Sequence, residues 1–484
     1  MKVYKIVLGM FAVFALLALL CRFYPEEGVT AGPFNLRFPS LAQVMGQNDT
    51  IPSEPEPSPE ELLAMRREEA RVRKTADYLE YFRNSPARIH FPNDSIEMLD
   101  PFFSALEGAD TAGLRIVHYG DSQIEEDRIS ATLRRELQNR FGGNGPGLLP
   151  LVQTVGTSTL NQWASDEPAR YMVYGQGWHL DDGAYGVRGQ VNRLSGSINI
   201  SFLPYSKAEK SPSTIYRRAT VLAGNLRSPL SVTVSGNTQT LDSIAGPVAR
   251  IRFNLPDSTD RLKMSLSGRA DIYGIQLDGV NGVTVDNVPM RGSTGAVFTK
   301  IAPEYLVDYF RKENVRMIIL QYGGNAVPYL KAGKSISSFV QSLAKQILHL
   351  KRLAPEAAIL FIGPADMATS IEGSLRTYPS LPTVVDSLKT AVLGSGAMFW
   401  DMFEAMGGAN TIVRWAEASP PLAAKDYVHF SRKGADKVAE MLCNSLMLYY
   451  DCYCWRNHAD RMLEIQDAAD STGIEAPADS LLAL

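Results

Sequence analysis

The sequence predicts an α/β fold, a doubly wound parallel sheet with helices on both faces, interrupted by an inserted all-β sandwich domain. A strand, a short turn and a helix follow one another at 112–143, which is how an α/β unit begins. Over about 155–285 the pattern changes to short alternating stretches that turn signals separate at intervals of about ten residues, which is typical of a sandwich. After Met290 helices and strands alternate again, so the interrupted sheet resumes.

Each element of the sheet domain has its own signature. The apolar run "GLRIVHYGDS" is the first strand, and "RISATLRRELQNRFGG" is a helix that ends at a glycine pair. Beyond the insertion we expect helices at 298–314, 335–355, 381–396 and 431–451, with strands at 315–325, 357–366 and 397–403. Before the sheet, Ser58, Pro59 and Glu61 predict a capped start for a long charged helix, and 95–110 reads as a second, amphipathic helix.

These patterns divide the chain of 484 residues into several parts. "PSEPEPSPEE" is an acidic, Pro-rich spacer of extended character inside a stretch without periodicity. The predicted parts are an N-terminal signal anchor or signal peptide (1–22), a linker (23–57), N-terminal helices (58–110), the sheet domain (111–155 and 286–458), the inserted sandwich (156–285) and an acidic tail (459–484) that is frayed or helical.

Composition excludes several classes of protein. A net charge of -4 without basic blocks gives no electrostatic footprint for nucleic acid. Four cysteines cannot form a disulfide scaffold, although two of Cys443, Cys452 and Cys454 could pair in an oxidising compartment, and the sequence leaves open which two. We find no His/Asp cluster with the spacing of metal ligands, so we expect no metal.

The N-terminus indicates export. Lys2 and Lys5 precede an apolar run over 6–21, which is long for a signal peptide and short for a full membrane span. No small-residue cleavage site follows closely, so we favour an uncleaved signal anchor with its lysines on the cytoplasmic side. Cleavage is the alternative, and both interpretations place the body of the protein outside the cytoplasm.

Polar residues follow three of the predicted strands and loops at the edge where an open parallel sheet collects its functional groups. The first strand ends in Asp121 and Ser122, the strand after the insertion ends in "GGN" with Asn325, and "KDYVHFS" precedes the last helix. On its own, this stretch favours a turn residue or helix cap at Ser122 over a nucleophile. Together, however, these groups are the inventory of acyl transfer, namely a nucleophile, a base, a carboxylate that orients the base, and oxyanion donors.

With these residues the chain resembles the SGNH (GDSL-type) serine hydrolases. "GDS" at 120–122 is similar to the first block of that family, "GGN" at 323–325 to the block that ends in an oxyanion asparagine, and "DYVHFS" at 426–431 to the Asp-x-x-His block. The family's "GDSL" is "GDSQ" here, a departure that does not touch the mechanism. The remaining block needs a glycine, for which Gly292 is the best candidate and Gly295 the alternative.

The resemblance implies a role for each matched residue, and the mechanism that it implies needs no cofactor. Ser122 would be the nucleophile, His429 its general base, and Asp426 the carboxylate that fixes the imidazole tautomer. The N–H groups of Ser122 and Gly292 and the side-chain amide of Asn325 would surround the developing oxyanion.

The insertion sharpens this interpretation, because a β-sandwich between the first and second blocks resembles the arrangement in peptidoglycan O-acetylesterases. We therefore expect a membrane-anchored periplasmic or cell-surface esterase that removes O-acetyl groups from a polysaccharide or peptidoglycan. A polysaccharide O-acetyltransferase with the same triad is the alternative, and water access to the pocket would separate the two. A noncatalytic glycan-binding protein is a third possibility.

Four further residues invite a functional interpretation that we set aside. Asp366 in "GPADMA" is better explained as a turn former than as a pocket residue. His118 is better explained as a core histidine with satisfied hydrogen bonds than as a catalyst. Trp178 and His179 could belong to a sugar-facing loop, but a Gly-rich loop with an anchoring aromatic is the safer interpretation.

Overall fold

The computed structural model describes residues 3–25, 27–31, 34–46, 57–206, 210–330 and 333–472. The chain forms two compact units, 1–68 and 69–484, and each is described here by itself.

The first unit begins with helix α1 (Val3–Phe23), in which Tyr4–Phe23 is long and apolar enough to cross a membrane, a property that signal sequences share. The stretch after it was expected to lack regular structure, but it contains a two-stranded hairpin and one helical turn, β1 (Val29–Ala31), β2 (Phe34–Leu36) and α2 (Leu41–Val44). The reason is local, because the pairing of β1 with β2 and a Ser40–Gln43 capping box satisfy the backbone. Residues 52–56 of the predicted spacer lie outside the described ranges.

The predicted cap of the long charged helix is confirmed. Helix α3 (Pro59–Asn84) begins after Ser58, whose hydroxyl accepts a hydrogen bond from the Glu61 N–H (3.2 Å) while its own N–H donates to the Glu61 carboxylate (2.7 Å).

The second unit contains the predicted parallel sheet. Its strands stand in the order β14 (Val283–Pro289), β4 (Leu114–Gly120), β15 (Val315–Gln321), β16 (Ala358–Ile362), β19 (Met398–Trp400) and β3 (Ile89–His90). All pair in parallel except the short edge strand β3. In chain order the parallel strands run 2-1-3-4-5, the flavodoxin-like doubly wound order, so the predicted fold class is confirmed.

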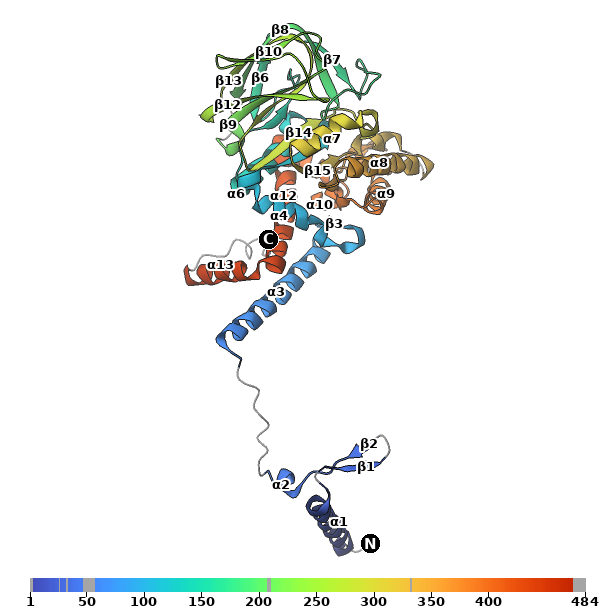
Figure 1. Ribbon diagram of the computed structural model, residues 1–484. Helices are drawn as coiled ribbons and strands as arrows, with labels where there is room; N and C mark the ends of the chain where they lie inside the picture. The colour runs from blue at the N-terminus through green and yellow to red at the C-terminus, as the bar shows by residue number, and fades with distance from the viewer. Residues whose placement is uncertain are drawn as a thin grey trace. The chain divides into compact units, whose positions relative to one another are not determined.

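Helices cover both faces of this sheet because its strands are apolar on both sides. Ile116 of β4 belongs to a core with α6 (Ser130–Phe141) and α12 (Arg432–Asn457), whereas the next residue, Val117, belongs to a separate core. That second core includes α7 (Pro303–Lys312), α8 (Gly333–Leu353) and α9 (Leu381–Gly394) (Figure 1). The remaining elements are α4 (Asp100–Glu107), α5 (Ala109–Ala112), β17 (Ala368–Ile371), β18 (Ser374–Thr377), α10 (Met402–Met406), α11 (Thr411–Glu417) and α13 (Ala459–Thr472).

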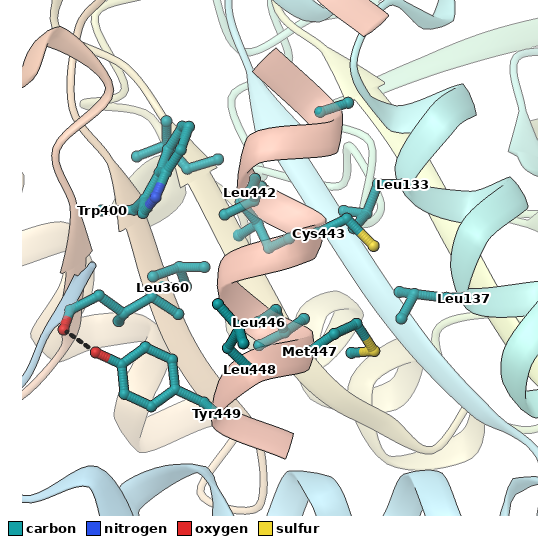
Figure 2. Packing of buried hydrophobic residues seen from close by; sticks show 14 of the residues in the cluster. Leu133, Leu137, Leu360, Trp400, Leu442, Cys443, Leu446, Met447, Leu448 and Tyr449 are labelled. Atoms are coloured by element: carbon teal, nitrogen blue, oxygen red, sulfur yellow. Dashed lines mark hydrogen bonds between the residues drawn. The ribbon is translucent and has the colours of Figure 1, made fainter. Parts of the chain in front are cut away.

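Helix α12 is buried along most of its length. Figure 2 shows Leu442 and Leu446 on the side of Trp400 and Leu360, and Cys443 turned toward Leu133 of α6. The Cys443, Cys452 and Cys454 thiols are free and buried, so the pairing considered above is not seen, and burial raises the pKa of the Cys443 thiol to about 12. The predicted tail begins as helix α13, and its residues beyond 472 lie outside the described ranges.

The β-rich insertion is confirmed as nine antiparallel strands. They are β5 (Gly147–Leu149), β6 (Leu160–Ala164), β7 (Ala169–Met172), β8 (Gln190–Pro204), β9 (Tyr216–Gly224), β10 (Leu230–Val234), β11 (Asn237–Leu241), β12 (Ala249–Thr259) and β13 (Leu262–Asp278). A sandwich has two separate sheets, but here the long strand β13 joins all the strands into one network. Its first part pairs with β8 and β10. From Asp271 onward it pairs with β9, with a register shift between Ile272 and Gly274, and from Ile275 it also pairs with β5.

The junction between insertion and sheet differs from the predicted boundaries. Strand β5 pairs with β13, so the inserted sheet begins at Gly147 rather than at 156. Strand β14 pairs with β4 from Val283 onward, so the parallel sheet resumes before 286. The alternating sequence of β14 resembles that of the inserted strands, and only its pairing partner identifies it.

Buried charges connect the two sheets at this junction. Arg115 of β4 donates to Asp278 of β13 (2.6 Å) and to Asp286 of β14 (2.5 Å), and the hydroxyl of Tyr309 on α7 donates to Asp286 (2.6 Å). The three charged side chains are at most 4% exposed. We call Arg115, Asp278, Asp286 and Tyr309 the Arg115 cluster.

Candidate active site

Ser122 lies where the central strand β4 ends. Asp121 turns the chain out of the sheet, and its carboxylate accepts a hydrogen bond from the Gln123 N–H (3.0 Å), which caps the short 3-10 helix of 122–127. Gly120 has no room for a side chain, since a Cβ there would lie 3.0 Å from Ile124 and 3.2 Å from the Gln321 carbonyl. The sharp turn leaves Ser122 half-buried at the carboxyl edge of the sheet.

Asn325 reaches the same edge from the neighbouring strand. Gln321, the last residue of β15, is in register with Gly120, so the two strands end side by side. Gly323 takes φ +123°, which favours glycine, and the chain then turns Asn325 toward the first loop. Its side-chain amide donates to the Asp121 carboxylate (3.0 Å) and to the Ser293 carbonyl (3.1 Å).

The third segment is the loop before α12. Ser431 caps that helix by accepting a hydrogen bond from the Gly434 N–H (3.2 Å), and Asp426 and His429 lie just upstream. The side-chain amide of Gln123 donates to the Val428 carbonyl (2.6 Å), which fixes this loop beside Ser122.

The structure brings Ser122, His429 and Asp426 into one line of hydrogen bonds. The Ser122 hydroxyl lies 2.8 Å from Nε2 of His429, and Nδ1 of the same ring lies 2.7 Å from the Asp426 carboxylate. The other oxygen of Asp426 accepts the N–H groups of Val428 and His429, each at 3.0 Å. This is the geometry in which an imidazole accepts a serine proton while a carboxylate holds its tautomer.

The electrostatics suit an ionised Asp426. Burial alone raises the pKa of its carboxyl, but the hydrogen bonds from His429 and Val428 outweigh burial and hold that pKa below its usual range. The Asp426 side chain is 49% exposed and that of His429 is 34% exposed, so water reaches the pair.

The predicted oxyanion donors differ in their access to the cavity that contains Ser122. Gly292 lines the cavity that contains Ser122, whereas the alternative, Gly295, donates its N–H to the Ser293 hydroxyl (3.1 Å) and leaves no space for a Cβ beside Tyr322. Asn325 also lines this cavity, but both of its amide hydrogens already have acceptors, so binding an oxyanion means weakening one of these bonds.

The cavity around Ser122 has a volume of about 410 Å³. Besides the residues above, it is lined by Pro364, Met367, Tyr378 and the exposed ring of Tyr329. Its size and mixed lining suit a small acyl group attached to a larger molecule.

The positions set aside above have structural partners. His118 is fully buried between Gln321 (3.1 Å) and the Ser130 hydroxyl (2.9 Å), and burial lowers its pKa to about 4, so it is a satisfied core histidine as predicted. Asp366 accepts hydrogen bonds from Thr377 and from the Ile412 N–H, and it also lines the cavity. Trp178 is not a buried anchor, because it is 63% exposed and lies tilted against Tyr171.

One group of potential metal ligands does assemble, far apart in sequence, where spacing could not reveal it. His90, Asp401 and Glu404 have ligand atoms within 4.8 Å of one another. The Lys389 ammonium already lies 2.7 Å from Asp401, so a lysine occupies the position that a cation would take.

Two positioning residues were missed by sequence reasoning. Gln123 holds the histidine loop, and Arg128 donates to the carbonyls of Ser122 and Phe430, each at 3.3 Å. Both bind backbone carbonyls of a distant segment, an interaction for which the sequence carries no local signal.

Asp121 provides a test of the local electrostatics. Burial raises the pKa of its carboxyl from 3.8 to about 6, although hydrogen bonds from Gln123 and Asn325 and the nearby His429 oppose it. The stability that this group contributes is therefore fully present below pH 3.8 and is lost as the pH rises through about 6, by about 3 kcal/mol in all.

We expect the free energy of unfolding of the unsubstituted protein to fall, relative to that of Asp121→Asn, between about pH 4 and about pH 7. Denaturant titrations at both pH values measure this, with the exposed Asp386→Asn as the control. If the difference in free energy of unfolding between the two proteins does not change with pH, the pKa of the Asp121 carboxyl is not raised.

A parallel sheet in the order 2-1-3-4-5, a β-rich insertion after its first strand and a Ser–His–Asp line at its carboxyl edge together define the class of fold and site that the sequence predicted. The chain is similar to a peptidoglycan O-acetylesterase structure, with 20% identity, a TM-score of 0.59 and coverage of 76% of this chain and 97% of that one. The resemblance in fold to an O-acetylesterase with an inserted β-domain is thus confirmed.

Two other solved structures share less. A family two carbohydrate esterase from Cellvibrio japonicus is 10% identical over 61% of this chain and 99% of that chain, with a TM-score of 0.23. One from Clostridium thermocellum in complex with cellohexaose is 11% identical over 56% and 99%, with a TM-score of 0.25. No family model and no curated protein matches the sequence.

Proposed function

We propose that this protein is a serine esterase that removes O-acetyl groups from an extracytoplasmic polysaccharide or peptidoglycan. The observation that carries the proposal is the line Ser122–His429–Asp426, with separations of 2.8 and 2.7 Å, in a cavity open to solvent. The shared fold with a peptidoglycan O-acetylesterase supports the choice of an acetylated glycan.

In the first half of the reaction, the Ser122 oxygen attacks the acetyl carbonyl carbon while Nε2 of His429 accepts the hydroxyl proton. The tetrahedral intermediate collapses, the sugar oxygen leaves with that proton, and acetyl-Ser122 remains. In the second half, His429 takes a proton from water and the hydroxide adds to the acetyl carbon. The bond from that carbon to the Ser122 oxygen then breaks, the oxygen takes the proton back from His429, and acetic acid leaves and ionises to acetate. Asp426 stabilises the imidazolium formed in each half.

The exposure of the catalytic pair favours water as the acceptor. With Asp426 and His429 partly exposed, water can reach the acetyl-enzyme directly, as hydrolysis requires. An acetyltransferase would need to exclude it, so the geometry supports an esterase over the transferase considered above.

The proposed location rests on helix α1. Its apolar side chains are exposed along its length, and its length and composition suit a single membrane span. We propose that α1 is a signal anchor and that the esterase acts at the periplasmic or outer side of that membrane.

The deciding experiment traps the intermediate. The full chain, solubilised in detergent, is mixed with p-nitrophenyl acetate, and the reaction is quenched in acid. The protein is then digested with a protease, and the peptide masses are measured by mass spectrometry. The proposal predicts an acetyl group on the peptide that contains Ser122, together with steady release of nitrophenol, and neither in Ser122→Ala. A single burst without turnover would indicate a transferase that awaits its sugar acceptor, and an unmodified peptide without turnover would refute the hydrolase.

Asn325→Ala is expected to lower kcat by about a hundredfold to a thousandfold, because one oxyanion donor is removed. KM for a small acetyl ester should change little, since the donor acts mainly in the transition state. Steady-state kinetics measure both constants, with the exposed Asn254→Ala of β12 as the control. An unchanged kcat would mean that Asn325 only holds Asp121 and Ser293 in place.

A further inference from the structure

A second cavity, of about 420 Å³, lies next to the one that contains Ser122. It is lined by Glu125, three residues after Ser122, and by Arg291, next to Gly292, and these two side chains form an ion pair (Nε to Oε2, 2.9 Å). Its other walls include residues of the insertion, among them Arg170, Tyr174 and Arg188, as well as residues of α6 and β14. The two cavities are therefore close together, since the consecutive residues Arg291 and Gly292 line one cavity each.

Arg188 is the unusual residue of this second cavity. It is only 5% exposed, and one guanidinium nitrogen, Nη1, donates to the Leu148 and Asn287 carbonyls at 3.0 and 3.4 Å. Its buried Nε has no hydrogen-bond partner, and no carboxylate of the described chain forms an ion pair with it. Asp286 lies near, but it already binds Arg115, Tyr309 and the Leu148 N–H. A buried guanidinium without a counter-ion is costly unless a ligand supplies one.

The charges of the lining leave room for one negative group. Four arginines and three acidic residues line the cavity, a formal charge of +1. Arg134 pairs with Asp127 (2.7 Å) and Arg291 with Glu125, while the half-exposed Glu126 lies 3.9 Å from Arg128 outside the lining. Arg170 donates only to the Thr154 hydroxyl, at 3.5 Å, so Arg170 and Arg188 remain without a carboxylate among the residues that the structure describes.

We infer that this second cavity is a subsite for a carboxylate-bearing sugar of the polymer, held by Arg188 and Arg170 while the acetyl group of a neighbouring position enters the Ser122 cavity. The inference rests on the proposed function and narrows its substrate to an acidic glycan. A planar guanidinium matches a carboxylate with two parallel hydrogen bonds. A single negative charge also suits the +1 lining better than a doubly charged phosphate.

The rest of the lining is that of a sugar site. Tyr174 offers an aromatic ring, and the side chains of Gln153, Thr154 and Gln190 offer amides and a hydroxyl for sugar OH groups. Two sources provide the carboxylate chemistry, uronic acids in polysaccharides and the free lactyl carboxylate of muramic acid in glycan strands stripped of peptide.

The test compares acidic and neutral substrates on the full chain. One arm uses an O-acetylated oligouronate and an otherwise identical oligomer whose carboxyls are reduced before acetylation. The other arm uses O-acetylated, peptide-free peptidoglycan strands with free or methyl-esterified lactyl groups. The variants are Arg188→Gln and Arg170→Gln, and Arg261→Gln is the control, since Arg261 is 73% exposed at a distant turn.

We expect the unsubstituted protein and Arg261→Gln to favour the acidic member of one arm by at least about tenfold in kcat/KM, and each cavity variant to lose that preference. Equal kcat/KM for acidic and neutral members in both arms, or a preference that survives in both variants, would overturn the inference. Because Arg188→Gln risks misfolding, the half-exposed Arg170→Gln keeps the test decisive. Turnover of p-nitrophenyl acetate checks the proposed function independently, and calorimetric titration of Ser122→Ala with the deacetylated acidic oligomer tests the subsite without catalysis.

Discussion

Ser122→Ala and His429→Ala are each expected to lower kcat for an acetyl ester by about six orders of magnitude, and Asp426→Asn by about four. In the proposed mechanism the three side chains act as one unit, because the proton of Ser122 would move to Nε2 of His429 only while Asp426, 2.7 Å from Nδ1, holds the ring. A Ser122→Ala/His429→Ala double variant should therefore be no slower than either single variant.

The chain contains its own control for this prediction. Ser130 and His118 form a second Ser–His pair, 2.9 Å apart, but both are fully buried and neither lines the cavity around Ser122. Ser130→Ala is expected to retain turnover of p-nitrophenyl acetate, and release of p-nitrophenol, followed by stopped-flow absorbance, measures kcat for this and the preceding variants. Loss of activity in Ser130→Ala combined with activity in Ser122→Ala would show that the wrong serine has been identified.

Arg115→Met is expected to destabilise the protein by about 3–5 kcal/mol, because it leaves Asp278 and Asp286 buried without their counter-ion. Burial already raises the pKa of Asp278 against the effect of Arg115, so the variant carboxylates would take up protons or draw water into the junction. Thermal and denaturant unfolding of the full chain measure the loss.

Glu356→Gln serves as the matched control for Arg115→Met. It removes a surface ion pair with Arg316 in which the glutamate side chain is 72% exposed, and it should change the free energy of unfolding by less than about 1 kcal/mol. If Arg115→Met were no more costly than this substitution, the Arg115 cluster would not hold the insertion to the sheet.

The sheet and the meeting of the candidate residues were predictable for a physical reason. Parallel strands end at a common edge, so the polar residues after β4 and β15 had to lie close together, and Ser122 and Asn325 do. The Asp426–His429 loop was harder to place, because the interactions that hold it, such as Gln123 with the Val428 carbonyl, join residues about three hundred positions apart.

The features of the second unit that sequence reasoning missed depend on long-range pairing, whereas the missed hairpin of residues 29–36 is local. β14 reads like an inserted strand, and its place in the parallel sheet follows only from its pairing with β4. Only three-dimensional contacts show that both amide hydrogens of Asn325 have acceptors. The same is true of the absence of a carboxylate partner for Arg188 among the described residues. The sequence shows that these residue types are present, but not which groups satisfy them.

The Arg115 cluster bears on regioselectivity. A glycan-binding module on a flexible linker concentrates an enzyme on its polymer, but it does not select an ester by its position along the polymer, because the linker does not fix the distance between the module and the active site. Here four buried side chains, three from the two sheets and Tyr309 from α7, join the insertion to the sheet domain, so we expect the spacing between Arg188 and Ser122 to stay constant through turnover. An enzyme built in this way would remove an acetyl group at one set distance from a carboxylate and leave chemically identical esters elsewhere on the chain untouched.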